Sequence, residues 1–83
     1  SSQYEKVLQE YSEAIRGMEL NQQLSDLAEK MLRLEQTGFA TGEADFDDVL
    51  DWKRKQLTYR LELEKAKTKA RDSLYEIQFL TGR

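Results

Sequence analysis

The chain has 83 residues, a formal net charge of −3, and neither proline, cysteine nor histidine. A chain of this length forms at most one small domain, and its abundance of charged and long unbranched side chains is typical of exposed α-helices. Acidic and basic residues are interleaved, so there is no positive field to attract nucleic acid, and without cysteine or histidine the chain offers no disulfide, zinc site or thiolate nucleophile.

An amphipathic pattern occupies the first half of the chain. From Tyr4 to Met18 the apolar residues recur at alternating steps of three and four, which predicts one face of an α-helix. Beyond Met18 the apolar stripe moves to another set of residues: Leu20, Leu24, Leu27, Ala28, Met31, Leu32 and Leu34. We interpret this shift as a step of the apolar face around the helix between Gly17 and Gln22. The pattern predicts a helix over residues 3–40, in which Gly17 packs closely or marks a mild irregularity.

A glycine and a group of carboxylates interrupt the periodicity near the middle of the chain. Gly42 follows the last periodic residues, and glycine readily adopts the left-handed conformation that ends many helices. Asp45 suits the N-cap of a second helix, with Asp48 three residues later in the position of a capping box. We therefore expect a tip over residues 41–45 between two helices.

A second long pattern covers residues 46–81. Its apolar residues form two stripes, one through Trp52, Tyr59, Leu63, Ala66, Ala70 and Ile77, the other through Leu50, Leu57, Leu61 and Leu74. Because the tip is so short, the two helices must run antiparallel, which predicts an all-α coiled-coil hairpin as a single domain. One partner helix covers only one stripe. We therefore expect further helices on the second stripe, and self-association of the chain into a four-helix dimer.

The carboxylates of the tip have several possible roles. Asp45 and Asp47 suit capping and the dipole of the second helix. Asp48 and Asp51 lie three residues apart and project from the same face, which is more than capping requires. If that face lined a pore or met a basic partner, the pair would form a negative patch. The basic run that follows is interpreted as a solvated face, with Asp51 and Lys55, and Asp47 and Lys53 or Arg54, at or near ion-pair distance along the helix.

Other kinds of site have little support. The acidic segment lacks the glycine and the distal glutamate of an EF-hand loop, so we expect no specific metal site. A two-helix hairpin provides no cleft that restricts water, and we expect neither an enzyme nor a cofactor. The chain contains no apolar run long enough to cross a bilayer, so we expect no membrane contact by this segment. Phe39 and Phe46 flank the tip and are expected to pack across it.

One motif joins the tip to the second helix. An aromatic residue, two further residues and a glycine make up Phe39-Ala-Thr-Gly42, a polar stretch leads to Asp48-Val-Leu-Asp51, and the long helix ends at Leu80-Thr-Gly82. This motif resembles the outer-membrane efflux protein family, the TolC-like channels of bacterial export systems. The resemblance implies one periplasmic hairpin of an outer-membrane protein, packed beside other hairpins of a trimeric channel.

The resemblance also implies roles for individual residues. Asp48 and Asp51 would line the channel entrance and contribute to its gating. The tip would dock onto the hairpin of a periplasmic adaptor protein, through Phe39, Thr41, Gly42, Glu43, Ala44 and Asp45. The alternative is a free-standing coiled-coil module that holds protein partners together and has no channel role.

Overall fold

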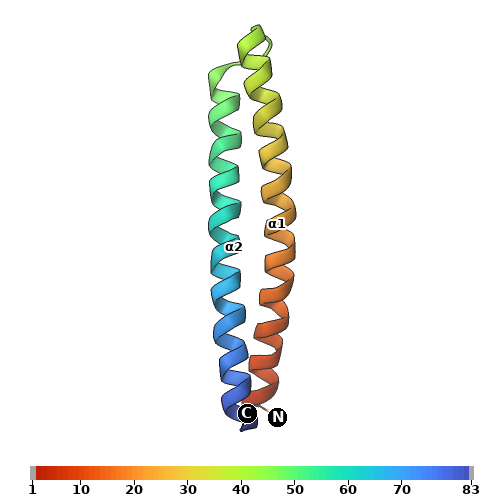
Figure 1. Ribbon diagram of the computed structural model, residues 1–83, viewed down its shortest axis with the longest axis vertical. Coiled ribbons are helices and arrows are strands. Elements are labelled where there is room, and N and C mark those ends of the chain that lie inside the picture. The colour runs from red at the N-terminus through yellow and green to blue at the C-terminus, as the bar shows by residue number, and fades with distance from the viewer. Residues whose placement is uncertain (1, 83) are drawn as a thin grey trace.

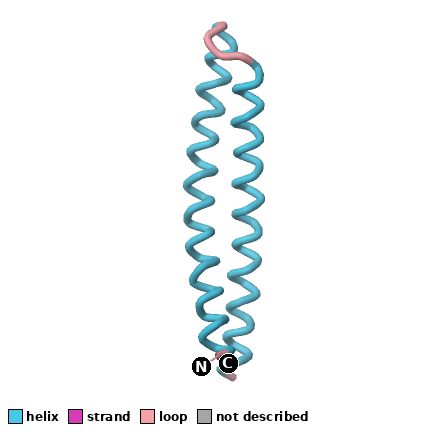
Figure 2. Tube along the Cα trace, turned by 180° about the vertical axis from the view of Figure 1, so that it is seen from behind, coloured by secondary structure: helices cyan, strands magenta, loops and turns pink. Residues whose placement is uncertain are grey.

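Two long helices joined by a short tip form the fold. The computed structural model describes residues 2–82, in which α1 spans Gln3–Thr41 and α2 spans Phe46–Thr81 (Figure 1). The helices run antiparallel in a rod that measures 61 × 17 × 15 Å, and both ends of the chain lie opposite the tip (Figure 2). The expected all-α hairpin is confirmed, and α1 continues one residue beyond its expected end.

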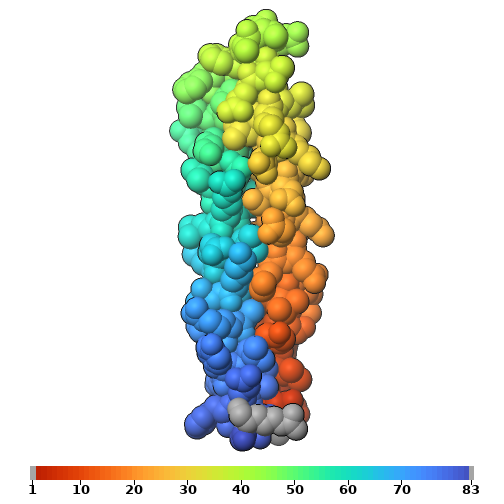
Figure 3. All heavy atoms as spheres, viewed as in Figure 1, coloured from red at the N-terminus to blue at the C-terminus, as the bar shows by residue number. Residues whose placement is uncertain are grey.

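The contact between the helices, here called the seam, follows a strict heptad pattern. One set of buried and half-buried residues recurs at alternating steps of three and four along each helix, the spacing that keeps one stripe of each helix facing its neighbour. In α1 they are Val7, Tyr11, Ala14, Met18, Asn21, Ser25, Ala28 and Leu32, and in α2 they are Val49, Trp52, Gln56, Tyr59, Leu63, Ala66, Ala70, Ser73 and Ile77. In the space-filling view the two helices touch along most of their length (Figure 3).

The apolar face of α1 does not step around the helix, and this prediction was wrong. The seam continues from Met18 through Asn21 and Ser25, because small or internally bonded polar side chains can occupy it. The Asn21 amide donates to the Gly17 carbonyl at 2.9 Å, so Asn21 remains hydrogen-bonded at the seam. Of the second set, Leu20, Leu27 and Leu34 stay exposed, by 55%, 52% and 62%. Leu24 and Met31 are half-buried, and Ala28 and Leu32 lie at the seam. We call Leu20, Leu24, Leu27, Met31 and Leu34 the outer stripe of α1.

Small residues allow the helices to approach closely at the seam. A Cβ atom at Gly17 would lie 3.5 Å from the Cβ of Ala66, an ordinary van der Waals contact, so Gly17 marks close packing as expected. The stripe from Trp52 to Ile77 faces the seam, whereas Leu57 and Leu61 of the other α2 stripe are 52% and 55% exposed. Among residues 2–82 only six apolar residues are buried while thirteen large ones are exposed, so the hairpin has a thin core and apolar outer faces.

Candidate docking tip

The helix α1 ends in a Schellman motif. Gly42 has φ +81° and ψ 9°, its N–H donates to the Phe39 carbonyl at 3.2 Å, and the Glu43 N–H donates to the Gly38 carbonyl at 2.7 Å. The Ala44 N–H and the Thr41 hydroxyl also donate to the Gly38 carbonyl, each at 3.1 Å. These bonds satisfy carbonyls that the end of a helix would otherwise leave without partners, and they fold the tip back onto α1.

We predict that Gly42→Ala destabilises the hairpin by about 1 kcal/mol, because a Cβ is disfavoured at positive φ. The matched control is Gly82→Ala, which has a similar φ of +73° at the last turn of α2. Gly82→Ala should lower the stability of the hairpin less, since unravelling the last turn of α2 disturbs no other part of the hairpin. Urea denaturation followed by circular dichroism measures both. Equal losses would show that the conformation of Gly42 does not limit the closure of the tip.

Gly38 is a residue of the tip that the sequence prediction overlooked. A Cβ at this position would lie 3.1 Å from the Cβ of Ala44, closer than most real contacts, so the tip closes over a position without a side chain. The signal was available: a glycine inside a helix costs roughly 1 kcal/mol relative to alanine, and this one lies one turn before the C-cap glycine. A groove of mixed polarity beside the tip is lined by Leu34, Glu35, Thr37, Gly38, Thr41, Glu43 and Ala44.

The helix α2 begins with the expected capping box. Asp45 has an extended backbone, and its carboxylate accepts the Asp48 N–H at 3.1 Å, while the Asp48 carboxylate accepts the Asp45 N–H at 3.3 Å. The Asp48 side chain therefore holds the start of α2. It is nonetheless exposed, and its negative charge remains at the surface of the tip.

Asp51 forms a different ion pair from the one expected. Its carboxylate lies 3.5 Å from the guanidinium of Arg54, whereas the Lys55 ammonium lies 4.3 Å from the centre of the Trp52 ring. The aromatic face attracts Lys55, and Arg54 at i+3 reaches the carboxylate instead. Within residues 2–82 Asp47 forms no ion pair with Lys53 or Arg54, because Arg54 lies beside Asp51 and Lys53 donates to Gln56 at 3.3 Å.

The structure gathers the expected docking residues at one end of the rod. Phe39 and Phe46 pack across the tip as expected, with ring centroids 5.8 Å apart and planes inclined by 52°, and each remains about half exposed. Among the remaining docking residues, Ala44 is half-buried, and the exposed ones are Thr41, Gly42, Glu43 and Asp45. Asp48 and Asp51 follow on the first turns of α2. The tip thus exposes an aromatic pair beside several carboxylates, on a backbone held by the Schellman motif and the capping box.

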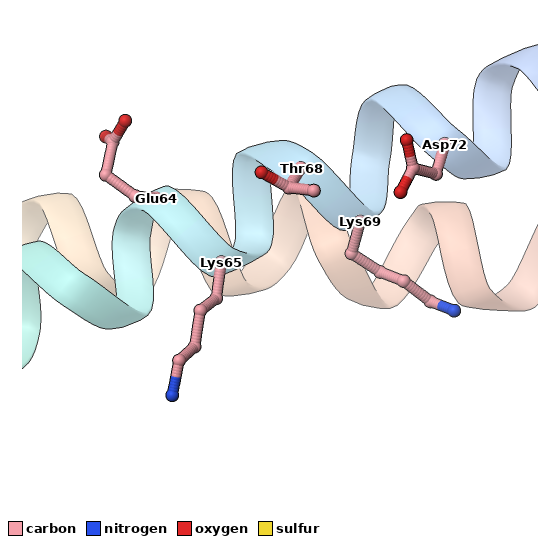
Figure 4. Close-up of a pocket in the computed structure, with 5 residues that line it drawn as sticks. All are labelled: Glu64, Lys65, Thr68, Lys69 and Asp72. Atoms are coloured by element: carbon pink, nitrogen blue, oxygen red, sulfur yellow. The ribbon is translucent and has the colours of Figure 1, made fainter.

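Elsewhere on the surface of residues 2–82 no comparable arrangement is present. The depression in Figure 4 is lined by side chains from α2 alone, and they point in different directions: Glu64, Lys65, Thr68, Lys69 and Asp72. Lys69 instead reaches Glu10 of α1 at 3.0 Å, and the hydrogen bond and negative charge of Glu10 raise the pKa of Lys69 above its usual 10.5. Over residues 2–82 no group of three or more acidic side chains is arranged to hold a metal ion.

Comparisons of the chain with models of protein families, with curated proteins and with solved structures gave no significant match. In the part of the chain that the structure describes, neither helix contains a stretch both long and apolar enough to cross a membrane. The geometry of the tip and the chemistry of its side chains are therefore the basis for a functional proposal.

Proposed function

We propose that this chain is the periplasmic tip hairpin of an outer-membrane export channel, where it docks an adaptor protein and contributes to gating of the entrance. The observation that supports the proposal is the tip itself. A Schellman motif and a capping box reverse the chain within residues 42–45 and leave two aromatic rings and several carboxylates exposed at the end of a 61 Å rod.

Docking would use the aromatic pair and the groove beside it. Phe39 and Phe46 together offer apolar area that a partner can cover, and aromatic side chains commonly dominate the energy of such contacts. The polar backbone groups of the tip are largely bonded to one another, so the tip is ordered before a partner arrives. A tip of fixed shape loses little conformational entropy when it binds the hairpin of an adaptor.

Gating would use the charges of Asp48 and Asp51. Both carboxylates are exposed on the first turns of α2, one in the capping box and the other beside Arg54. In a trimeric channel the pair would recur around the axis and form a ring of negative charge, which attracts and retains cations at a constriction.

The test replaces the tip hairpin of a trimeric efflux channel with residues 3–81 of this chain and records Mg²⁺ block in planar bilayers. Asp48→Asn and Asp51→Asn should each raise the Mg²⁺ concentration for half-block about fivefold, the effect of about 1 kcal/mol of Coulomb energy. Asparagine can still accept the Asp45 N–H, so the cap of α2 persists. The control, Asp72→Asn, removes an exposed carboxylate far from the tip and should leave block unchanged. Unchanged block in both tip variants would rule out the gating role.

The free-standing interaction module remains the second candidate, and the exposed outer stripe of α1 favours it. A module that only holds helices together needs apolar side faces and has no use for charge at the tip. If the chain is such a module, adaptor hairpins fail to bind it, and removal of the charges at the tip leaves partner binding unchanged. Substitutions in the outer stripe would instead abolish partner binding.

A further inference from the structure

The two sides of the seam differ in charge. On one side Gln3 donates to Glu76 at 2.9 Å and Glu10 lies 3.0 Å from Lys69, so rows of residues spaced by seven on each helix meet there with opposite or neutral partners. The other side is bordered by the rows on the opposite flank of the seam: Leu8, Ile15, Gln22, Glu29 and Gln36 on α1, and Phe46, Lys53, Arg60, Lys67 and Leu74 on α2. There the charged residues of α2 are all cations.

These three cations lack enough negative partners within the hairpin. Lys53, Arg60 and Lys67 are exposed and stand about 10.5 Å apart along α2, given the rise of an α-helix. Within residues 2–82 neither Lys53 nor Arg60 forms an ion pair, whereas Lys67 lies 3.0 Å from Glu64 on its own helix. The one charged residue in the facing row of α1, Glu29, forms its ion pair within α1. Positive charge therefore remains uncompensated along this side.

Leucines lie on the same face of α2 as the cations. The face follows steps of three and four, and we call it the basic stripe: Leu50, Lys53, Leu57, Arg60, Glu64, Lys67, Arg71 and Leu74. Leu57 is 52% exposed and Leu74 is 40% exposed, so both offer apolar area that a partner can cover. Steps of three and four are the spacing of a surface on which another helix packs lengthwise. The basic stripe thus combines helix-packing leucines with four cations and a single carboxylate.

A helix that covers the basic stripe must bring negative charge. Covering the cations with apolar side chains would remove them from water without a partner, which is costly, and charges beside a helix seam select the helices that pair. Carboxylates that recur once per heptad on a partner helix have the same axial spacing as Lys53, Arg60 and Lys67, so they can reach all three together. A flat anionic surface fits less well, because a rod lying on it would also press Glu64 and the acidic tip against like charge.

We propose that the basic stripe binds an acidic amphipathic helix of a partner protein, which places leucines over Leu50 and Leu57 and carboxylates beside the cations. The proposal accounts together for exposed leucines and heptad-spaced cations on one face of α2. It does not rest on the proposed function, since neither Asp48 nor Asp51 belongs to the basic stripe, and a partner bound there leaves the tip free.

A designed peptide tests the charge requirement. The probe is a fluorescent peptide of four heptads, with leucine at the two core positions of each heptad and glutamate beside them, whose like charges keep it from pairing with itself. In fluorescence anisotropy the native chain should bind this peptide saturably, and Arg60→Glu should weaken binding at least about tenfold while circular dichroism shows that the helices persist. The matched control, Lys65→Glu, reverses a lysine that pairs with Glu62 and lies outside the basic stripe, so binding should change less than about twofold. Absence of saturable binding, or equal losses in the two variants, would overturn the proposal.

Truncation of a leucine tests whether the partner packs as a helix. Leu57→Ala should weaken binding of the same peptide about fivefold, because it removes apolar area from the contact. The matched control is Leu27→Ala, which truncates a leucine of α1 that is also 52% exposed and should leave binding unchanged. Unchanged binding in Leu57→Ala, or tighter binding of the native chain to phosphatidylserine vesicles than to the peptide, would show a surface for anionic groups in general and overturn the proposal. A native chain that dimerises in sedimentation and becomes monomeric in Arg60→Glu would overturn it too, since a second copy would then occupy the basic stripe.

Discussion

Leu63→Ala is expected to cost about 2–5 kcal/mol, which is most of the stability that a hairpin of this size can have. Leu63 is 8% exposed and is one of the few large apolar residues buried at the seam. Along the seam of α2 it lies between Tyr59 and Ala66. Truncation removes its apolar area from the thin core and leaves a cavity, and both effects lower the stability of the hairpin.

Leu61→Ala is the matched control for this experiment. Leu61 lies two residues away on the same helix but is 55% exposed, so its truncation should change stability by no more than about 0.5 kcal/mol. Urea denaturation of both variants, followed by circular dichroism at concentrations where the native chain is monomeric, compares them directly. Similar losses at the two positions would mean that α2 buries the wrong stripe and that the seam is misplaced.

The sequence predicted the architecture because each of its signals was local. Gly42 and Asp45 mark the end of one helix and the start of the next through backbone conformations that depend on only a few neighbouring residues. The periodic patterns on either side of these two residues are so long that helix is the only structure they fit. A short tip then leaves the antiparallel arrangement as the only possible one.

The choice of the buried face on α1 could not be predicted from hydrophobicity. Beyond Met18 the leucines form the more apolar stripe, yet Asn21, Ser25 and Ala28 lie at the seam. Two antiparallel helices keep the stripe that continues in register along their full length, and small side chains let them approach most closely. The leucines were read as the buried face because a single sequence does not reveal how many partner surfaces a helix has.

Only part of the candidate site could be predicted from the sequence, because only some of its features depend on neighbouring residues alone. The residues of the tip and its capping box could be identified from local sequence, as could the contact between Phe39 and Phe46. Which basic residue pairs with Asp51 depends on competition among several side chains within one turn, and Trp52 decided it by attracting Lys55. Spacing alone cannot resolve such a competition.

Small and polar residues of α1 lie at the seam, and many of its large apolar residues lie on the outer stripe. This arrangement explains why the seam tolerates polar residues. Three buried residues at the seam are polar: Ser25, Gln56 and Ser73. A core built from such residues gives little hydrophobic stabilisation, because alanine and serine remove only a small apolar area from water. Most of the large apolar residues are exposed, where contact with further helices can bury them. The hairpin should therefore gain much of its final stability on association.

Ser73→Ala is expected to stabilise the hairpin, the opposite sign from most substitutions at buried positions. Ser73 is 2% exposed, and its hydroxyl is the one buried side-chain polar atom without a hydrogen-bond partner in the described chain. Such a hydroxyl has lost its bonds to water, which costs about 1–3 kcal/mol. Removing it should recover most of that energy, together with the roughly 0.5 kcal/mol by which alanine exceeds serine in helix propensity.

Ser12→Ala separates these two contributions. Ser12 is exposed in the middle of a helix, and its hydroxyl accepts a hydrogen bond from Arg16 at 2.8 Å, so its replacement tests helix propensity without a buried hydroxyl. Thermal and urea denaturation should show a gain for Ser73→Ala that exceeds the change for Ser12→Ala by at least about 1 kcal/mol. A loss of stability in Ser73→Ala would mean that the hydroxyl is hydrogen-bonded in solution. The extra gain would instead show that the seam, even at one of its most buried positions, is not optimised for the stability of the single hairpin.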